Sequence, residues 1–390
     1  MFRNTTKPDR AVRTNQYIKS QARAAALAVI VAASAGGYAL AADMPVKAKA
    51  PPPPKPVPFF FVNDNSVSFS WFFNATDPGV SGGSNTVPGG IFGDKNTFYR
   101  AQGSFDHFDV WEYGTNLIHL EVNQYGPQDP IDGQPGAVGA REFFGFTRST
   151  IGFNELTHSK MFDTFLTNDV GFESGFTAGV ENNYLAEQTT QYLVGANFDL
   201  KIPKPLGTML VGVLARKEFT HNEFDACAAP FGFGVASGGA NGACLAPFAG
   251  TTFSGDRSFN WDWNVEIFNS IPLASLGGWA DALHIVNILN IRGPKGTGIS
   301  TANCLALGCF GPAGAFATNE TKTEVFEDAR LSLDASKVFW GKPGIWDTYV
   351  GYRYWYNKFG TNHDAFLFST IAPGTSIEST AYLGTTYHFK

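Results

Sequence analysis

Polar and apolar residues alternate one by one along most of the chain from residue 66 onward, which is the period of a β-strand with two unlike faces. The last segment, 376–389, shows this clearly, since Tyr387 and Phe389 share one face and Tyr382 and His388 share the other. Each segment is long enough to cross a bilayer at a tilt, which takes about 9–11 residues. Twelve such segments are predicted as strands: 66–74, 97–108, 115–125, 141–153, 170–181, 188–200, 207–221, 257–271, 280–292, 322–335, 346–358 and 376–389.

The connections between these segments alternate in length. Those after the odd-numbered strands are long and rich in Gly, Pro, Asn and Ala, except for 182–187, and those after the even-numbered strands are mostly short, except for 154–168. A closed barrel with long extracellular loops and short periplasmic turns has this alternation, whereas a soluble sandwich or propeller does not require it. The sequence therefore predicts an all-β, closed antiparallel transmembrane barrel of about twelve strands over residues 63–390.

The N-terminus has the features of an export signal. A basic segment precedes a short apolar core at 24–35, and Ala39-Leu40-Ala41 forms an A-x-A cleavage site, which predicts a signal peptide over residues 1–41. The Pro-rich stretch that follows predicts an extended periplasmic linker over 42–62. Export without an apolar run of 18 residues fits the periplasm, the cell exterior or the outer membrane, and the predicted barrel selects the cell outer membrane as the location.

Composition narrows the class further. Of the 390 residues, 16% are charged and 15% are aromatic, and the mean hydropathy is −0.10. A mean hydropathy near zero argues against a helical membrane protein, whose spans would raise the average. It is compatible with a barrel, because the lipid-facing apolar residues and the lumen-facing polar residues cancel in the average. Loss of six Lys/Arg and one Asp with the signal peptide leaves 22 basic against 33 acidic residues, which argues against nucleic acid as a partner.

The four cysteines are expected to pair after export, because they lie in two of the long connections. Of the three possible connectivities, pairing between sequence neighbours is preferred. No histidine or second CxxC accompanies either pair, so no metal site is predicted, and no cofactor. The cysteines and preferred pairs are Cys227 with Cys244 and Cys304 with Cys309.

Charge identifies the inner face of each strand, because a charge in lipid costs about 2–4 kcal/mol at mid-depth. The inner faces carry both signs of charge together with aromatic rings. Either these side chains fill a narrow interior, or the rings stack on a planar solute whose polar edge is bound by ions and amides. The predicted lumen and solute-contact residues are Glu121, Phe144, Phe146, Arg148, Glu266, Phe326, Asp328, Arg330, Tyr349, Arg353, Trp355 and Tyr382.

Several local strings resemble the Tsx-type nucleoside-specific channels of bacterial outer membranes. They are TNLIHLEVNQYG (115–126), the segments 192–219 and 260–291, YVGYRYWYN (349–357) and AYLGTTYHF (381–389). The resemblance is one of pattern and spacing over most of 66–389, and loops 222–256 and 293–321 have no counterpart. It implies passive diffusion of nucleosides through a narrow pore with weak binding sites.

Other functions are weighed against this channel. A non-conducting structural or surface-binding barrel fits the loops and a filled interior, and a general porin would use charge rings of one sign. A barrel phospholipase needs a His–Ser pair on the outer wall, and no serine is evident beside His221, so no catalytic residue and no enzyme is predicted. The expected partners are outer-membrane lipid, the barrel-assembly machinery through the last strand, and a nucleoside solute; the oligomeric state is left open, with a monomer favoured.

Overall fold

The computed structural model describes residues 59–78, 80, 96–129, 131, 138–183, 187–226, 254–296, 321–364, 369 and 373–389, all within the compact unit Pro58–Lys390. The predicted signal peptide, nearly all of the predicted linker and the four cysteines lie outside the described residues.

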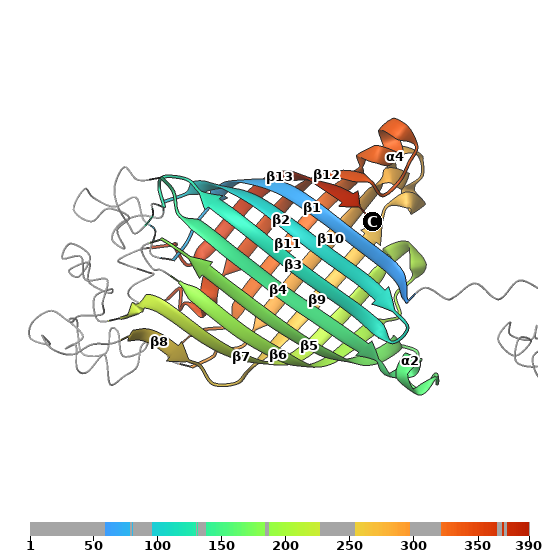
Figure 1. Ribbon diagram of the computed structural model, residues 1–390, viewed down its shortest axis with the longest axis horizontal. Coiled ribbons are helices and arrows are strands. Elements are labelled where there is room, and N and C mark those ends of the chain that lie inside the picture. The colour runs from blue at the N-terminus through green and yellow to red at the C-terminus, as the bar shows by residue number, and fades with distance from the viewer. Residues whose placement is uncertain are drawn as a thin grey trace, which may run out of the picture. The chain divides into compact units, whose positions relative to one another are not determined.

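The described chain forms one closed antiparallel barrel, as Figure 1 shows. Twelve strands close the ring, because β1 pairs with β13 and β6 pairs with β7, so the predicted fold class is confirmed. The ring strands are β1 (Phe60–Ala75), β2 (Phe98–Trp111), β3 (Gly114–Tyr125), β4 (Arg141–Gly152), β5 (Thr167–Glu181), β6 (Gln188–Leu200), β7 (Thr208–Ala226), β9 (Asp262–Pro272), β10 (Leu283–Arg292), β11 (Glu324–Asp334), β12 (Trp346–Tyr356) and β13 (Ile377–Phe389).

The predicted closure between the first and last strands is present, with Val67 opposite Tyr387 and Phe72 opposite Tyr382. Strand β1 begins at Phe60, so its first residues lie in the stretch 42–62 that the sequence predicted as linker. Closure satisfies the backbone hydrogen bonds of both strands and leaves no open edge in the ring.

The predicted strand 257–271 is wrong as a single element. It is divided into β8 (Ser254–Ser258) and β9, both of which pair with β7. Phe259 and Asp262 are both buried although they are three residues apart, which breaks the period of two. Phe259 instead donates its backbone N–H to the carbonyl of Glu218, 3.0 Å away. The irregularity lets β8 continue beside the outer part of β7.

The two ends of the barrel differ. The long connections leave from one end, here called the loop end, and the short connections join strands at the other, here called the turn end. The turn end carries short helices: α2 (Phe153–Thr157), η2 (Lys204–Leu206), η4 (Ala274–Leu276), η5 (Gly278–Ala282) and α4 (Ala335–Trp340). Only η6 (Lys358–Gly360), among the described helices, lies at the loop end. No described helix has the length and apolar character that crossing a membrane requires.

Helix α4 shows how a turn-end connection is closed. The Asp334 carboxylate accepts the Lys337 backbone N–H at 2.8 Å, and Gly341 ends the helix with φ near 65°, which glycine adopts without a steric cost. Asp334 is therefore both the last residue of β11 and the N-cap of α4.

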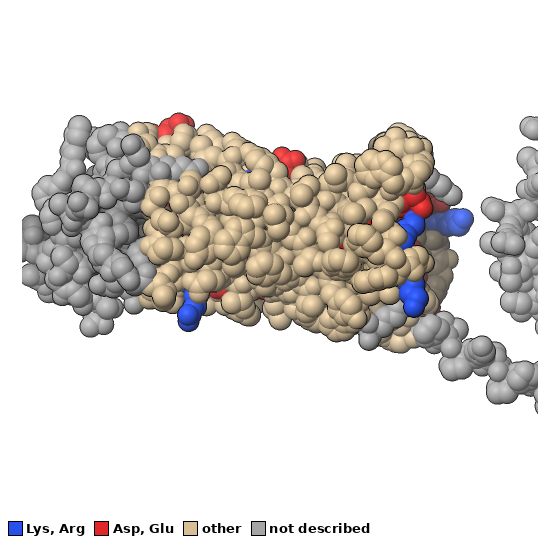
Figure 2. Space-filling model, turned by 90° about the horizontal axis from the view of Figure 1, so that it is seen from above, with Lys and Arg blue, Asp and Glu red and all other residues tan. Residues whose placement is uncertain are grey.

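The outer wall is apolar, in contrast to an ordinary soluble surface. Val67, Phe69, Val122, Val350 and Leu383 are each between 46% and 60% exposed on strand faces that point away from the interior. In Figure 2, Lys, Arg, Asp and Glu cover little of the visible wall and gather mainly towards one end. The exposed wall therefore supplies an apolar band around the strands.

Candidate lumen site

The predicted lumen residues form two groups on the inner face of the ring. The first group lies on β11, β12 and β13 and consists of Phe326, Asp328, Arg330, Tyr349, Arg353, Trp355 and Tyr382. The second group lies on β3, β4 and β9 and consists of Glu121, Phe144, Phe146, Arg148 and Glu266. Each group is held together by contacts between side chains of different strands.

The first group is centred on a guanidinium between aromatic faces. Arg353 donates from Nε to Asp328 Oδ2 at 2.7 Å, and its Cζ lies 5.3 Å from the centre of the Phe326 ring. The same guanidinium lies 4.7 Å from the centre of Phe72, whose ring also packs against Tyr382. Asp328 accepts the Tyr382 hydroxyl as well. These five residues are called the aromatic–guanidinium cluster.

Two of the predicted contact residues are packed away from the interior space. Tyr349 and Tyr382 are 6% and 5% exposed, because their rings lie over Gly384 and Gly351 of the neighbouring strands. The Tyr349 hydroxyl also shares a 2.8 Å hydrogen bond with Ser70. Both tyrosines fill space that glycine leaves on the inner face, so they offer a solute little surface.

The second group contains an ion pair that crosses the interior. Arg148 of β4 donates from Nε and Nη2 to the two carboxylate oxygens of Glu266 of β9, at 2.9 and 2.7 Å. Strands β5, β6 and β7 separate these two strands around the ring, so the pair is a chord across the interior. It is called the cross-barrel pair. Its side chains keep 14% and 18% exposure, which shows that solvent reaches it.

An aromatic ring and a histidine extend the second group. His119 stacks on Phe146 with ring centres 5.0 Å apart, and its two ring nitrogens contact Asp106 and Glu121 at 2.6 and 3.0 Å. Phe144 lies 6.3 Å from Phe146 on the same strand. The group thus combines a ring face with ionisable side chains, as the first group does.

Open space lies beside the cross-barrel pair. Phe268 and Ile288 point inward, since they are opposite each other on β9 and β10 and Ile288 is opposite the inward Asp328 of β11. They are nevertheless 38% and 37% exposed. Apolar side chains that face the interior and remain this accessible show that the barrel is not filled at their level.

Buried charges occupy part of the interior towards the loop end. Arg216, the largest fully buried side chain, donates to both oxygens of Asp262 at 2.9 Å and contacts Glu218 at 3.3 Å. Lys295 pairs with Glu218 from the connection that follows β10, and Lys295 Nζ lies 4.4 Å from the centre of Phe259. The period of two along β7 places Arg216 and Glu218 on the inner face, but the period alone does not show that the two charges are desolvated together.

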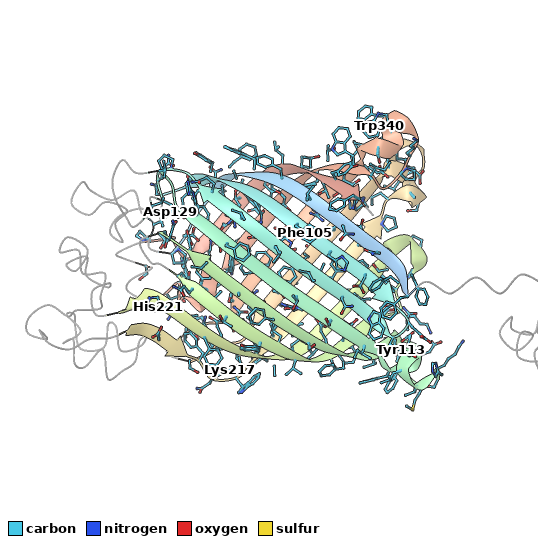
Figure 3. All side chains as sticks on the ribbon, viewed as in Figure 1. Phe105, Tyr113, Asp129, Lys217, His221 and Trp340 are labelled. Atoms are coloured by element: carbon cyan, nitrogen blue, oxygen red, sulfur yellow. The ribbon has the colours of Figure 1, made fainter. Side chains whose placement is uncertain are left out.

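A separate hollow of about 500 Å³ lies outside the ring at the loop end, where β6, β7 and β8 meet. His221 Nδ1 lies 3.0 Å from Asp256 Oδ1 there, and Ser258 lines the same hollow. In the described hydrogen bonds, however, His221 bonds to Asp256 and no bond joins it to Ser258. Figure 3 shows His221 and Asp129 at the loop end and Tyr113 and Trp340 at the turn end.

Comparison with known proteins gives only distant structural matches. No protein-family model and no curated protein matches the chain. The translocator domain of the autotransporter NalP from Neisseria meningitidis aligns with a TM-score of 0.36 and 9% identity, covering 84% of this chain and 89% of that one. The KdgM porin aligns with a TM-score of 0.33 and 8% identity, covering 83% and 99%. OccAB3 of Acinetobacter baumannii aligns with a TM-score of 0.27 and 8% identity, covering 84% and 98%. Similarity at this level does not identify a solute.

Proposed function

We propose that the barrel spans the outer membrane of a Gram-negative bacterium and lets small hydrophilic solutes diffuse passively through its interior. The apolar band on the wall supports a lipid environment, because its exposed Val, Leu and Phe side chains would be costly in water. Exposed tips at the turn end, such as Phe165 at 86%, Trp279 at 77% and Trp340 at 57%, suit the interfacial zone, where aromatic residues are enriched.

The observation that carries the channel proposal is the exposure of Phe268 and Ile288 on the inner face. Their accessibility supports a path for solvent beside the cross-barrel pair. The lumen side chains carry both signs of charge, which argues against a general ion pore with rings of one sign. The favoured solute is therefore uncharged and hydrophilic.

Among such solutes we favour nucleosides. The aromatic–guanidinium cluster places the Phe326 face next to Arg353 and Asp328, so a base could stack while a sugar is hydrogen-bonded. This choice agrees with the resemblance of the sequence to Tsx-type channels. Binding has to remain weak, because a solute held tightly would not leave the pore.

The test is conductance of the purified protein in a planar bilayer, with and without adenosine or thymidine. Saturable block by nucleoside is expected. Phe326→Ala should weaken that block by about 1–3 kcal/mol, or roughly 5–150-fold, because one stacking face is lost. Phe73→Ala is the matched control, since Phe73 is 48% exposed on the outer wall. If the protein conducts but no nucleoside blocks the current, the proposed nucleoside specificity is wrong and the proposed channel function stands.

A non-conducting barrel is the second candidate. The cross-barrel pair and the buried charges at the loop end favour it, because both occupy interior space. Absence of conductance in the same bilayers would select this candidate, with a structural or surface-binding role.

We propose no enzymatic role. A hydrolase on the wall needs a nucleophile hydrogen-bonded to a base, and among the described hydrogen bonds none joins His221 to Ser258. We therefore expect no lipid hydrolysis in vesicles, and no difference between the natural protein and Ser258→Ala. Release of fatty acid that Ser258→Ala abolishes would establish the opposite.

The last strand, β13, is proposed as the segment that the barrel-assembly machinery recognises.

A further inference from the structure

Three acidic residues from separate parts of the sequence converge at the loop end. Asp77 follows β1, Asp129 follows β3, and Glu181 is the last residue of β5. One carboxylate oxygen from each lies within 4.8 Å of the others. The residues are 1%, 1% and 5% exposed, so the three carboxylates share a desolvated site. They are called the carboxylate triad.

The cations nearby neutralise only one member of the triad, Asp77. Lys358 Nζ pairs with Asp77 and donates to Glu378 at 2.7 Å, and Arg100 Nη2 donates to Glu378 at 3.1 Å. These two cations balance Asp77 and Glu378. In the described residues no Lys, Arg or His forms an ion pair with Asp129 or Glu181. Two carboxylates of the triad therefore lack a cationic partner.

Unpartnered atoms are a second and independent sign of a ligand. Asp129 Oδ2 and Glu181 Oε1 are both buried and have no hydrogen-bond partner. An ionised oxygen removed from water without a partner is strongly destabilising, so such atoms need a proton or a cation. The two carboxylates therefore require a proton or a bound cation to be stable in this buried site.

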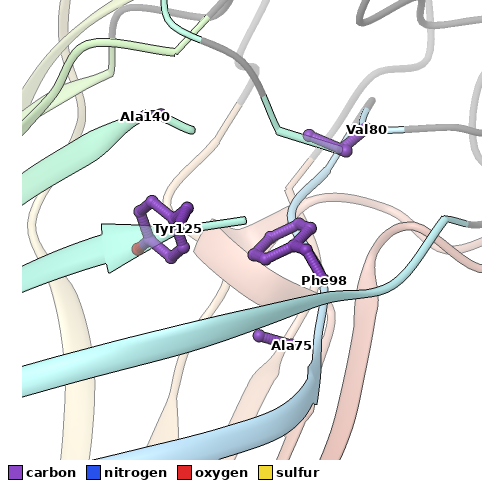
Figure 4. Close-up of a cluster of buried hydrophobic side chains, with 5 residues drawn as sticks. All are labelled: Ala75, Val80, Phe98, Tyr125 and Ala140. Atoms are coloured by element: carbon purple, nitrogen blue, oxygen red, sulfur yellow. The ribbon is translucent and has the colours of Figure 1, made fainter. Parts of the chain in front are cut away.

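The surrounding backbone fixes the triad. Asp77 O accepts the backbone N–H of Val80 at 3.0 Å, and Asp129 O accepts that of Ala140 at 2.7 Å. Val80 and Ala140 pack with Ala75, Phe98 and Tyr125 in a buried apolar cluster, which Figure 4 shows. These backbone hydrogen bonds and the apolar cluster fix the backbone at Asp77 and Asp129, so the site is formed before a ligand binds.

We propose that Asp77, Asp129 and Glu181 bind a divalent cation, and that the ion is Ca²⁺. Carboxylate oxygens are the ligands that Ca²⁺ prefers, and its flexible geometry tolerates waters in the remaining positions. The bound ion ties together the loop ends of β1, β3 and β5. This proposal does not depend on conductance, since binding and stability measure it directly.

The test uses full-length protein, refolded in detergent and stripped with EGTA, with Ca²⁺ alone as the probe. Calorimetric titration should show one site with a dissociation constant of about 10⁻⁴–10⁻³ M, the range of extracellular Ca²⁺ modules. Saturating Ca²⁺ should raise the melting temperature followed by circular dichroism, and EGTA should reverse the rise. The double variant Asp129→Asn/Glu181→Gln should bind Ca²⁺ at least tenfold more weakly and lose the shift.

The matched control is Glu112→Gln/Asp163→Asn, which removes two exposed carboxylates at the turn end and should keep the Ca²⁺ response. If the double variant does not fold, the natural protein is tested with Tb³⁺ instead. Tb³⁺ bound at the triad should luminesce when Tyr125 is excited, and added Ca²⁺ should displace the Tb³⁺ and remove the signal. The proposal would be overturned if Ca²⁺ at up to 10 times the expected dissociation constant gave no heat of binding, no rise in melting temperature and no displacement of Tb³⁺ luminescence. The carboxyl groups would then be explained by a proton that they share. An unchanged Ca²⁺ response in the double variant would overturn it equally.

Discussion

At the residue scale, glycines decide where the interior aromatic rings lie. The Tyr382 ring occupies the place where a side chain at Gly351 would project, and the Tyr349 ring does the same at Gly384. An aromatic ring laid over a glycine on the neighbouring strand is a known way to pin register in a sheet. Tyr349 and Tyr382 therefore support the wall, and the solute-facing part of the first group is carried by Phe326 and Arg353.

Gly351→Ala should destabilise the barrel by about 1–3 kcal/mol, because the added methyl group overlaps the Tyr382 ring and forces it out of its position. Gly103→Ala is the control, since a Cβ there meets no atom within 4 Å, and it should be neutral or slightly stabilising. Urea unfolding in lipid vesicles, followed by Trp fluorescence, measures both changes. Equal effects of the two substitutions would show that ring packing on glycine is unimportant.

At the element scale, the alternating pattern predicted the strands well because each strand has an apolar face and a polar face over its whole length. Ten or more alternating residues leave little freedom in register, since a slip of one residue would turn every charge into the wall. The pattern failed at 254–261, because SGDRS is short and polar and Phe259 turns inward out of phase. The short helices at the turn end were missed for the same reason, as they have fewer than two turns of periodic sequence.

Val350→Arg should prevent or slow insertion of the barrel into vesicles. Val350 is 60% exposed near the middle of β12, where a charge facing lipid costs about 2–4 kcal/mol. Val338→Arg makes the same change at a residue that is 51% exposed on α4, beyond the strands, and should insert normally. The fraction folded is read from the heat-dependent shift in gel mobility. Normal insertion of both variants would contradict a lipid-facing wall.

At the scale of the whole molecule, contacts between non-neighbouring strands were beyond sequence reasoning. Alternation shows that Arg148 and Glu266 face inward, but it cannot show which charge lies across the ring from which. The carboxylate triad was missed because its members lie about 50 residues apart in loops or at a strand end. Asp77 lies two residues after β1, Asp129 four residues after β3, and Glu181 at the end of β5, so no common spacing marks the three in the sequence.

Breaking the cross-barrel pair should widen the path through the interior. Arg148→Gln should increase single-channel conductance, because the guanidinium no longer bridges to Glu266. A double-mutant cycle with Glu266→Gln should give a coupling energy of about 0.5–3 kcal/mol for the two contacting residues. Phe143→Gln, on the outer face of the same strand, controls for general effects on β4. Unchanged conductance in Arg148→Gln would place the path elsewhere.

The cross-barrel pair also has a mechanical consequence. A ring of hydrogen-bonded strands resists stretching along its circumference, yet it can flatten into an oval without breaking a single backbone bond. A bidentate link between β4 and β9, which have β5, β6 and β7 between them on one side, acts as an internal brace that opposes flattening. The cross-section of this barrel is therefore set from inside as well as by strand number. Without the cross-barrel pair, the open-channel current should fluctuate more between levels, even where its mean is little changed.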